Sequence, residues 1–378
     1  MPPPAESALA GDSAGQYDTK GGIRVEPTLR IGVIGCGEIA QIMHLPYLKE
    51  LPELEVAAIC DVSEALLAAV GEQFGVAKRY LDYRALLADE NLDAVAILTP
   101  DHADIAIAAA EAGKHIMVEK PLCFNLQEAE RIRTAVRRNR VKLMVAYMKR
   151  YDPGYQWALP LLRDLRDVRL IRVHDLGGSF AINREIYSLR TATDISPQLI
   201  EASQERIRAA MLQAIGEERA ALLPTYENLL LSCTHDAIVL RQAFGGPRQI
   251  LCADAFGVDC LVALLEYSPQ TRCVWEVGLL KAGQWWDESL TAYAVDRTVE
   301  ISFPFPYLRN APTTVTITQM EDGAVTRREV LASYDEAFKR EWRHFYTCVT
   351  EDREPITNVD EGVADIALLI DLIKAVRL

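Results

Sequence analysis

The sequence has no apolar run long enough to span a membrane, which takes about 18 to 20 consecutive residues. Its N-terminus also lacks a basic region followed by an apolar one, so we predict no secretory signal and a cytoplasmic location. Positive charge is scarce: 40 Lys and Arg stand against 54 Asp and Glu, a formal net charge of −14. Neutralisation of phosphates, the main source of non-specific affinity for nucleic acids, is therefore disfavoured. Neither a membrane nor a nucleic acid is an expected partner.

Paired cysteines are also missing, since no Cys-x-x-Cys occurs and no Cys and His cluster has the spacing of a zinc site. We predict no metal site. Most of the eight cysteines lie in apolar runs, which is typical of reduced thiols in a core. They are Cys36, Cys60, Cys123, Cys233, Cys252, Cys260, Cys273 and Cys348.

Internal repeats are absent, and 378 residues with 50% hydrophobic and 25% charged side chains are typical of a globular protein of two domains. Residues 1–27 carry Pro, Gly, Ser and Ala without apolar periodicity, and we interpret them as a flexible tail. We assign residues 28–148 to a first domain and residues 149–378 to a second. A helix-forming stretch near residues 197–231 is interpreted as an insertion in the second domain. The last helices are expected to cover the second sheet or return to the first domain.

The first domain alternates short β-rich runs with longer helical stretches. This spacing is typical of the α/β class, with a doubly wound, parallel Rossmann sheet and right-handed crossovers. Strands are expected at Leu29–Ile34, Val56–Cys60, Ala94–Leu98, His115–Val118 and Lys142–Ala146. Helices are expected at Ile39–Glu50, Ser63–Phe74, Asp104–Ala112 and Leu126–Asn139.

In the second domain strands follow strands, which indicates an α+β unit with an open, mostly antiparallel sheet. Because an exposed sheet face commonly requires a partner, we expect a homo-oligomer, either a dimer or a tetramer. Strands are expected at Val168–Asp175, Arg248–Phe256, Cys260–Tyr267, Thr271–Leu280 and Ser289–Phe303. Helices are expected in the insertion, near His235, and at Tyr334–Glu351 and Val359–Arg377.

A glycine-rich turn, Gly35-Cys36-Gly37-Glu38-Ile39-Ala40, follows the first strand and opens a helix. It is a G-x-G-x-x-A variant of the dinucleotide fingerprint. The first glycine allows the tight turn, the second lets the backbone approach a pyrophosphate, and the alanine allows close packing of helix on sheet. The residues of this turn expected to bind the cofactor are Gly35, Cys36, Gly37, Glu38 and Ile39.

The second strand ends in Asp61, about 20 residues beyond the glycines. A carboxylate there accepts hydrogen bonds from ribose hydroxyls and would repel a 2′-phosphate, which favours NAD over NADP as the cofactor. The alternative is a glycine turn without a nucleotide, in which Asp61 only caps the next helix.

Further motifs follow in order along the chain: His44-Leu45-Pro46, Thr99-Pro100-Asp101-His102, the run from Ala112 to Glu119-Lys120-Pro121, and Lys149-Arg150-Tyr151-Asp152-Pro153. Together with the glycine turn they resemble the Gfo/Idh/MocA family of glucose-fructose oxidoreductases and inositol dehydrogenases. The likeness covers most of residues 29–378. It implies cofactor contacts from Thr99, Pro100, His102, Glu119 and Lys120, although Asp101 or His102 could equally cap a helix.

The resemblance implies that Lys120 lies beside the nicotinamide and reaches the reacting hydroxyl of the substrate. An ammonium group near an alcohol stabilises the alkoxide that develops as hydride leaves, and it can help to relay the proton. The alternative is a solvated lysine at a strand end. The carboxyl edge of a parallel sheet, where ligands bind, favours the catalytic role.

The resemblance also implies that His235 is the general base, a role suited to a side chain that titrates near neutrality. Many members of the family have an Asp four residues earlier, where this chain has Leu231. Asp236 is adjacent to the histidine, but neighbours on a helix point about 100° apart. The alternative for His235 is a structural or substrate-binding role.

Four residues are candidates for substrate contacts: Lys149, Arg150, Tyr151 and Asp236. Tyr151 and the pair Trp285-Trp286 could stack on a sugar, although adjacent tryptophans between strands more often form a hairpin or subunit contact. The pocket walls come from the second domain and carry no motif that identifies the substrate.

We therefore expect an NAD-dependent oxidoreductase that oxidises a secondary hydroxyl of a sugar, glycoside or cyclic polyol, or reduces the ketone. Two alternatives stay open. One is a redox-neutral enzyme that oxidises a sugar carbon transiently before elimination or epimerisation. The other is a non-catalytic dinucleotide-binding regulator, favoured by Leu231 and disfavoured by Glu119-Lys120-Pro121.

Overall fold

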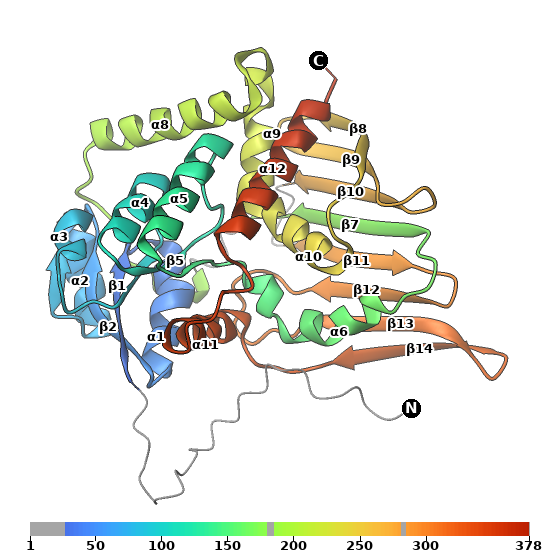
Figure 1. The fold of residues 1–378 in the computed structure, drawn as a ribbon, viewed down its shortest axis with the longest axis horizontal. Coiled ribbons are helices and arrows are strands. Elements are labelled where there is room, and N and C mark those ends of the chain that lie inside the picture. Colours follow the sequence, from blue (N-terminus) through green and yellow to red (C-terminus); the bar gives the residue numbers. More distant parts are fainter. Residues whose placement is uncertain (1–26, 180–184, 281–284, 378) are drawn as a thin grey trace, which may run out of the picture.

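The computed structural model describes residues 27–179, 185–280 and 285–377. Apart from Pro27, the predicted flexible tail lies outside these residues. Two sheets form the molecule, one of six strands and one of eight, with helices packed around and between them (Figure 1). None of the described helices is long and apolar enough to cross a membrane.

The six-stranded sheet has the order β3-β2-β1-β4-β5-β6, and all its described pairings are parallel. Its strands are β1 (Leu29–Ile34), β2 (Leu54–Cys60), β3 (Lys78–Tyr80), β4 (Ala94–Ile97), β5 (His115–Val118) and β6 (Leu143–Val145). The predicted Rossmann sheet is therefore confirmed. Strand β3 was not expected, because its three residues are exposed or half-buried and give no apolar run.

Helices cover both faces of this sheet, as its right-handed crossovers require. They are the π-helix η1 (Ala40–His44), α1 (Leu45–Glu50), α2 (Glu64–Phe74), α3 (Tyr83–Leu87), α4 (Ala103–Glu111) and α5 (Leu126–Asn139). Local signals set their ends. The hydroxyl of Ser63 accepts a hydrogen bond from Leu66 at the start of α2, and Gly75 ends that helix with a φ of 69°.

The eight-stranded sheet has the order β14-β13-β12-β11-β7-β10-β9-β8. Only the β7–β10 pairing is parallel among those described, so the predicted mostly antiparallel sheet is confirmed. Its strands are β7 (Leu170–Gly177), β8 (Gln249–Phe256), β9 (Cys260–Glu266), β10 (Arg272–Leu279), β11 (Trp286–Tyr293), β12 (Arg297–Phe303), β13 (Thr314–Glu321) and β14 (Ala324–Leu331). The run expected at Ser289–Phe303 is thus a hairpin of two strands.

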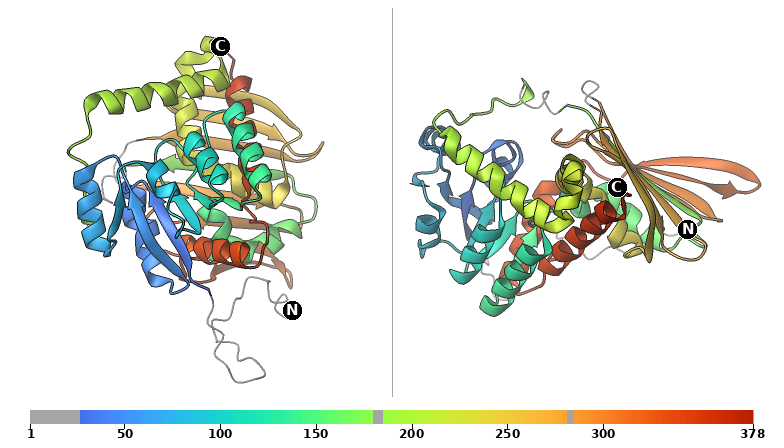
Figure 2. Two further views of the ribbon diagram at one scale, coloured as in Figure 1. Left: turned by 60° about the vertical axis from the view of Figure 1, so that its left-hand side comes forward. Right: turned by 90° about the horizontal axis from the view of Figure 1, so that it is seen from above.

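Burial alternates along the central strands of this sheet, so one face is packed and the other is more open. Figure 2 shows the helices gathered on the packed face, between this sheet and the Rossmann domain. They are η2 (Met148–Tyr151), α6 (Pro153–Arg163), α8 (Pro197–Ile215), η3 (Glu217–Leu222), α9 (Leu223–Asn228), η4 (Leu229–Cys233), α10 (Thr234–Phe244), α11 (Ala337–Thr350) and α12 (Val359–Ala375).

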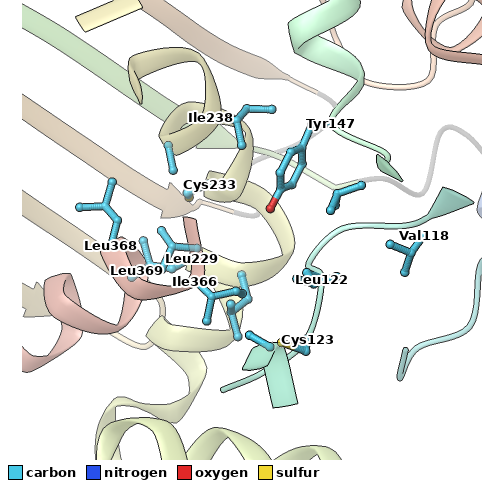
Figure 3. Packing of buried hydrophobic residues seen from close by; sticks show 14 of the residues in the cluster. Val118, Leu122, Cys123, Tyr147, Leu229, Cys233, Ile238, Ile366, Leu368 and Leu369 are labelled. Carbon is cyan, nitrogen blue, oxygen red and sulfur yellow. The ribbon is translucent and has the colours of Figure 1, made fainter. Parts of the chain in front are cut away.

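One hydrophobic core continues from the Rossmann domain into the second domain. Val118 of β5, Leu229 of η4 and Leu369 of α12 are all fully buried in it (Figure 3). Helix α11 extends a second cluster, in which Trp342 and Phe345 join residues of β1 and α1. The C-terminal helices therefore pack against the first domain and hold the carboxyl edge of its sheet next to the second.

Candidate functional site

The glycine turn leaves the carboxyl end of β1 open on one side. Gly35 has a φ of +99°, and a Cβ there would lie 2.8 Å from the backbone of Leu98, so glycine is required. A Cβ on Gly37 would meet no described protein atom within 4 Å. The space beside Gly37 fits the approach of a pyrophosphate to the backbone.

Asp61 lies against this turn. One of its carboxylate oxygens accepts from the backbone N–H of Cys36 at 2.8 Å, and the other accepts from that of Ser63 at 3.0 Å. The side chain remains half-buried at the end of β2. The structure therefore brings the predicted ribose-binding acid to the glycine turn, as a dinucleotide site requires. Glu38 and Ile39 are half-buried beside it, while the Cys36 thiol is buried and burial raises its pKa.

The loop after β4 lies next along the same edge. Thr99 donates from its hydroxyl to the carbonyl of Asp101, and Pro100 is exposed. The Nδ1 of His102 lies 2.7 Å from the carbonyl of Pro121, an acceptor only, so Nδ1 carries the proton. Burial lowers the pKa of His102. This imidazole is neutral and ties the loop after β4 to the loop after β5.

Glu119 and Lys120 follow β5, where a chain of hydrogen bonds fixes the glutamate. Trp342 donates its indole N–H to Nδ1 of His44, and Nε2 of His44 lies 2.9 Å from the Glu119 carboxylate. The second oxygen of Glu119 accepts from the Lys120 backbone N–H at 2.9 Å. Burial alone would raise the pKa of Glu119, but His44 and Lys120 outweigh it and keep that pKa below its usual value. The backbone that carries Lys120 is thus held from the end of η1, through His44, and from α11, through Trp342.

A cavity of about 530 Å³ opens between this edge and the second domain. Residues of both domains line it, among them the predicted catalytic pair Lys120 and His235. Its polar or aromatic lining includes Glu119, Lys120, Lys149, Asp152, Glu227, His235, Asp259, Trp286, Glu288 and Glu336. Its volume is in the range of small-molecule sites.

The Lys120 ammonium group donates a hydrogen bond to the backbone carbonyl of Leu231. Burial lowers the pKa of Lys120, while the carboxylates of Glu119 and Asp175 oppose that shift. Leu231 lies four residues before His235, where the resemblance implies an orienting acid, and it is 45% exposed. The backbone carbonyl of Leu231 nonetheless binds the Lys120 ammonium group, so this residue orients Lys120 rather than His235.

His235 lies on α10 and faces both lysines. Burial lowers the pKa of its imidazole well below 6.5, and the positive charges of Lys120 and Lys149 lower it further. Its Nδ1 is buried and has no hydrogen-bond partner among the described residues. A neutral imidazole can accept a proton. Here burial and nearby charges, rather than a bound carboxylate, determine its protonation state.

Three buried groups lie behind this wall. Asp175, Cys233 and Asp236 bring potential ligand atoms within 4.8 Å of one another. Burial raises the pKa of Asp175 to about 6, opposed by the charges of Lys149 and Lys120. The positive charge of Lys149 also opposes the rise in the pKa of Asp236. Asp236 accepts from the indole N–H of Trp275 at 3.0 Å and does not line the cavity.

Lys149 lies in the cavity wall, as expected for a substrate contact. Its ammonium group forms an ion pair with Glu288 and lies 4.4 Å from the centre of the Phe303 ring. Trp286 donates to the other Glu288 oxygen at 2.9 Å. Glu288 was not among the predicted site residues, whereas Trp286 was considered for stacking on a sugar. The signal for Glu288 is an acid in a strand of otherwise apolar inward positions.

Arg150 and Tyr151, also predicted as substrate contacts, are not among the residues that line the cavity, and both side chains are buried in other contacts. Arg150 donates to the carbonyl of Ile238 at 3.0 Å and pairs with Glu361 at 2.6 Å. The hydroxyl of Tyr151 bonds with that of Thr357 at 2.8 Å. These side chains join η2 to α10 and to the start of α12.

The family model and the curated relatives match the first domain of the chain. The sequence model of the GFO_IDH_MocA oxidoreductase family, described by its NAD-binding Rossmann fold, matches residues 29–147. A myo-inositol 2-dehydrogenase of Thermotoga maritima is 38% identical over 130 residues, which are 34% of this chain and 39% of that protein. A D-apiose dehydrogenase of Paraburkholderia graminis is 35% identical over 134 residues, 35% of this chain and 36% of that protein. The chain thus matches about two fifths of the length of these curated relatives.

Solved structures resemble the chain over a longer range. KijD10, a 3-ketoreductase from Actinomadura kijaniata solved with NADP and TDP-benzene, has a TM-score of 0.71 at 20% identity and covers 93% of this chain and 98% of that one. A protein of Desulfitobacterium hafniense, provisionally described as an NADPH-dependent oxidoreductase, has a TM-score of 0.74 at 16% identity. The match covers 92% of this chain and 96% of that one. At these identities the likeness shows a shared fold across both sheets. Residues 29–147 therefore resemble the Gfo/Idh/MocA family of oxidoreductases in sequence, and the rest of the chain resembles the solved structures in fold.

Proposed function

We propose that this protein is an NAD(P)-dependent oxidoreductase that oxidises a secondary hydroxyl of a sugar, glycoside or cyclic polyol, or reduces the corresponding ketone. The observation that carries the proposal is the cavity wall in which Lys120 and a neutral His235 lie together, next to the carboxyl edge of the Rossmann sheet. The names of the relatives, among them inositol and D-apiose dehydrogenases, favour a polyhydroxylated substrate.

Each residue has a separate task in this mechanism. The Lys120 ammonium donates to the reacting oxygen and stabilises the negative charge that develops on it. His235, neutral before reaction, takes the hydroxyl proton. The nicotinamide, when bound, supplies the acceptor for the hydride that leaves the same carbon. An alcohol thereby loses one hydride and one proton and becomes a ketone.

Different residues are assigned to the cofactor and to the substrate. Gly37 and Asp61 are assigned to the pyrophosphate and the ribose, and Asp61 favours NAD. The Lys149–Glu288 pair and Trp286 are assigned to the substrate. Carboxylates and indole faces are groups that bind sugar hydroxyls and sugar rings, respectively.

The proposal is tested by a screen for NADH formation over cyclic polyols, free sugars and glycosides, with purified wild-type protein and a Lys120→Met variant. We expect turnover on at least one substrate and a loss of about 1,000-fold in kcat in the variant, since positioned charge and proton transfer each contribute on this order. NAD binding is expected to stay within about threefold, because Lys120 is held mainly by Leu231.

Lys49→Met is the matched control, because Lys49 is an exposed lysine at the end of α1. It is expected to retain wild-type turnover. Full turnover in Lys120→Met would refute the mechanism. Conversion of a sugar without net NADH would favour the redox-neutral alternative, and dinucleotide binding without any turnover would favour a regulator.

A further inference from the structure

A segment of the second domain crosses the cofactor-binding edge of the first. This crossing segment, residues 185–196, leads into α8, which reaches over the Rossmann domain (Figure 2). Near the glycine turn, Gln41 donates to the carbonyl of Arg190 at 2.9 Å and accepts from the Arg190 backbone N–H at 2.8 Å. The same Gln41 amide also donates to the carbonyl of Cys36 at 2.8 Å. The crossing segment is therefore tied directly to the turn expected to hold the pyrophosphate.

Asp194 of the crossing segment lies at the N-terminus of α2. One of its carboxylate oxygens accepts from the backbone N–H of Ala65 at 3.0 Å, and the other accepts from the hydroxyl of Ser63. These neutral donors hold the pKa of Asp194 below its usual value. An acid from a distant part of the chain thus occupies a helix N-terminus, a position that otherwise attracts phosphate.

Ser63 places this acid beside the ribose-binding acid. Its backbone N–H donates to Asp61 at 3.0 Å while its hydroxyl donates to Asp194. Asp61 in turn accepts from the Cys36 backbone. The two carboxylates are therefore neighbours, linked through one serine, at the end of β2.

The 2′ position of the adenosine ribose is the point at which NAD and NADP differ, and it faces the acid at the end of β2. A 2′-phosphate carries close to two negative charges and needs donors or an arginine beside it. Here the Ala65 N–H and the Ser63 hydroxyl are already taken by a carboxylate. Any 2′-phosphate would have to displace Asp194 or lie against it.

We propose that Asp194 is a cofactor-specificity residue, which excludes the 2′-phosphate of NADP and so makes this protein select NAD. The inference rests on the proposed dinucleotide function. It adds a second acid, supplied by the substrate domain, to the one that ends β2. Cofactor choice then depends on the docking of the crossing segment as well as on the Rossmann turn.

The test measures the dissociation constants of NADH and NADPH by nicotinamide fluorescence, for wild type, Asp194→Asn and Asp194→Ala. The asparagine variant removes the charge but keeps an oxygen that accepts from Ala65. We expect NADPH to bind about tenfold more tightly in both variants, as the loss of one nearby like charge predicts, with NADH within about twofold. Thermal unfolding confirms that each variant is folded.

Glu201→Gln is the matched control, because Glu201 is an exposed acid on α8 and its loss changes the net charge equally. Its NADPH-to-NADH ratio is expected to equal that of wild type. An unchanged ratio in both Asp194 variants, or a wild type that binds NADPH at least as tightly as NADH, would overturn the assignment while leaving the proposed function intact. A protein that binds neither dinucleotide would overturn both.

Discussion

Two lysines and one histidine share the cavity wall, and their charges determine which of them can act as a base. Lys120 and Lys149 both lower the pKa of His235, in addition to the effect of burial. The imidazole is therefore neutral at physiological pH without a partner carboxylate. Leu231, which lacks the family's acid, contributes a carbonyl to Lys120 instead. Burial and two lysine charges, rather than an adjacent carboxylate, thus set the protonation state of His235.

This arrangement predicts the pH dependence of oxidation. A base must be neutral to act, and the pKa of His235 lies well below 6.5, so the acid limb of kcat/KM should lie below pH 6.5. In a Lys149→Met/Glu288→Gln variant, one cation is removed together with its partner, and the acid limb should move up by about one pH unit. The measurement is the pH profile of kcat/KM.

Glu288→Gln alone is the control for that profile. It removes the carboxylate but retains the Lys149 charge that acts on His235. Its acid limb is expected to stay with that of wild type. A double variant with the wild-type limb would show that Lys149 does not set the pKa of the base.

At the scale of elements, the helix α12 packs unusually close to the Rossmann domain. A Cβ on Gly362 would lie 2.8 Å from Cδ2 of Leu122 and 3.1 Å from a methyl of Val145, which belongs to β6. Glycine at residue 362 lets α12, a helix of the second domain, approach β6 at the edge of the Rossmann sheet. The contact continues the shared core of Figure 3.

Gly362→Ala is therefore expected to destabilise the protein by about 1–3 kcal/mol through overpacking, with a lower urea midpoint. Gly246→Ala is the control, because Gly246 is exposed and a Cβ there meets no described atom within 4 Å. Its stability should be unchanged or slightly higher. Equal stability of Gly362→Ala and wild type would mean that α12 shifts without cost.

Many elements with a strong apolar pattern were predicted, although the alternating strand β13 and the amphipathic helix α6 were missed. Strands β1 and β5 have the expected bounds, as does helix α5. Strand β14 is exposed along most of its length, so its sequence has little alternation to detect. The hairpin of β11 and β12 was interpreted as one strand because its turn, residues 294–296, contains neither glycine nor proline.

For the molecule as a whole, a single core joins the two sheets. Because buried residues of β5, η4 and α12 lie in one cluster, neither domain can lose its packing without exposing the other. We expect one unfolding transition in calorimetry, with the calorimetric and van't Hoff enthalpies equal. Two resolved transitions, or an enthalpy ratio well above one, would contradict this.

Some residues of the candidate site lie in short sequence motifs and could be predicted, whereas others come together only through long-range packing and could not. The cofactor edge is built from short consecutive motifs, so Gly35, Gly37, Asp61 and Lys120 could be proposed as site residues from the sequence, and they stay predictions. Glu288 and Asp194 reach the site only through sheet pairing and chain crossing. Arg150 and Tyr151 belong to a motif similar to the family's, but tertiary packing directs their side chains elsewhere.

The packing of α11 on α1 has a practical consequence for anyone who would produce the dinucleotide domain alone. Sequence comparison sets its boundary at residue 147, yet Trp342 and Phe345 complete the apolar cluster around Leu45 and Leu48. A fragment cut at that boundary would expose this cluster to water and release His44 from its indole partner. The part of the chain that matches the family model is therefore smaller than the part that packs together. The hydrogen bonds that hold Glu119 in place are complete only in the larger part.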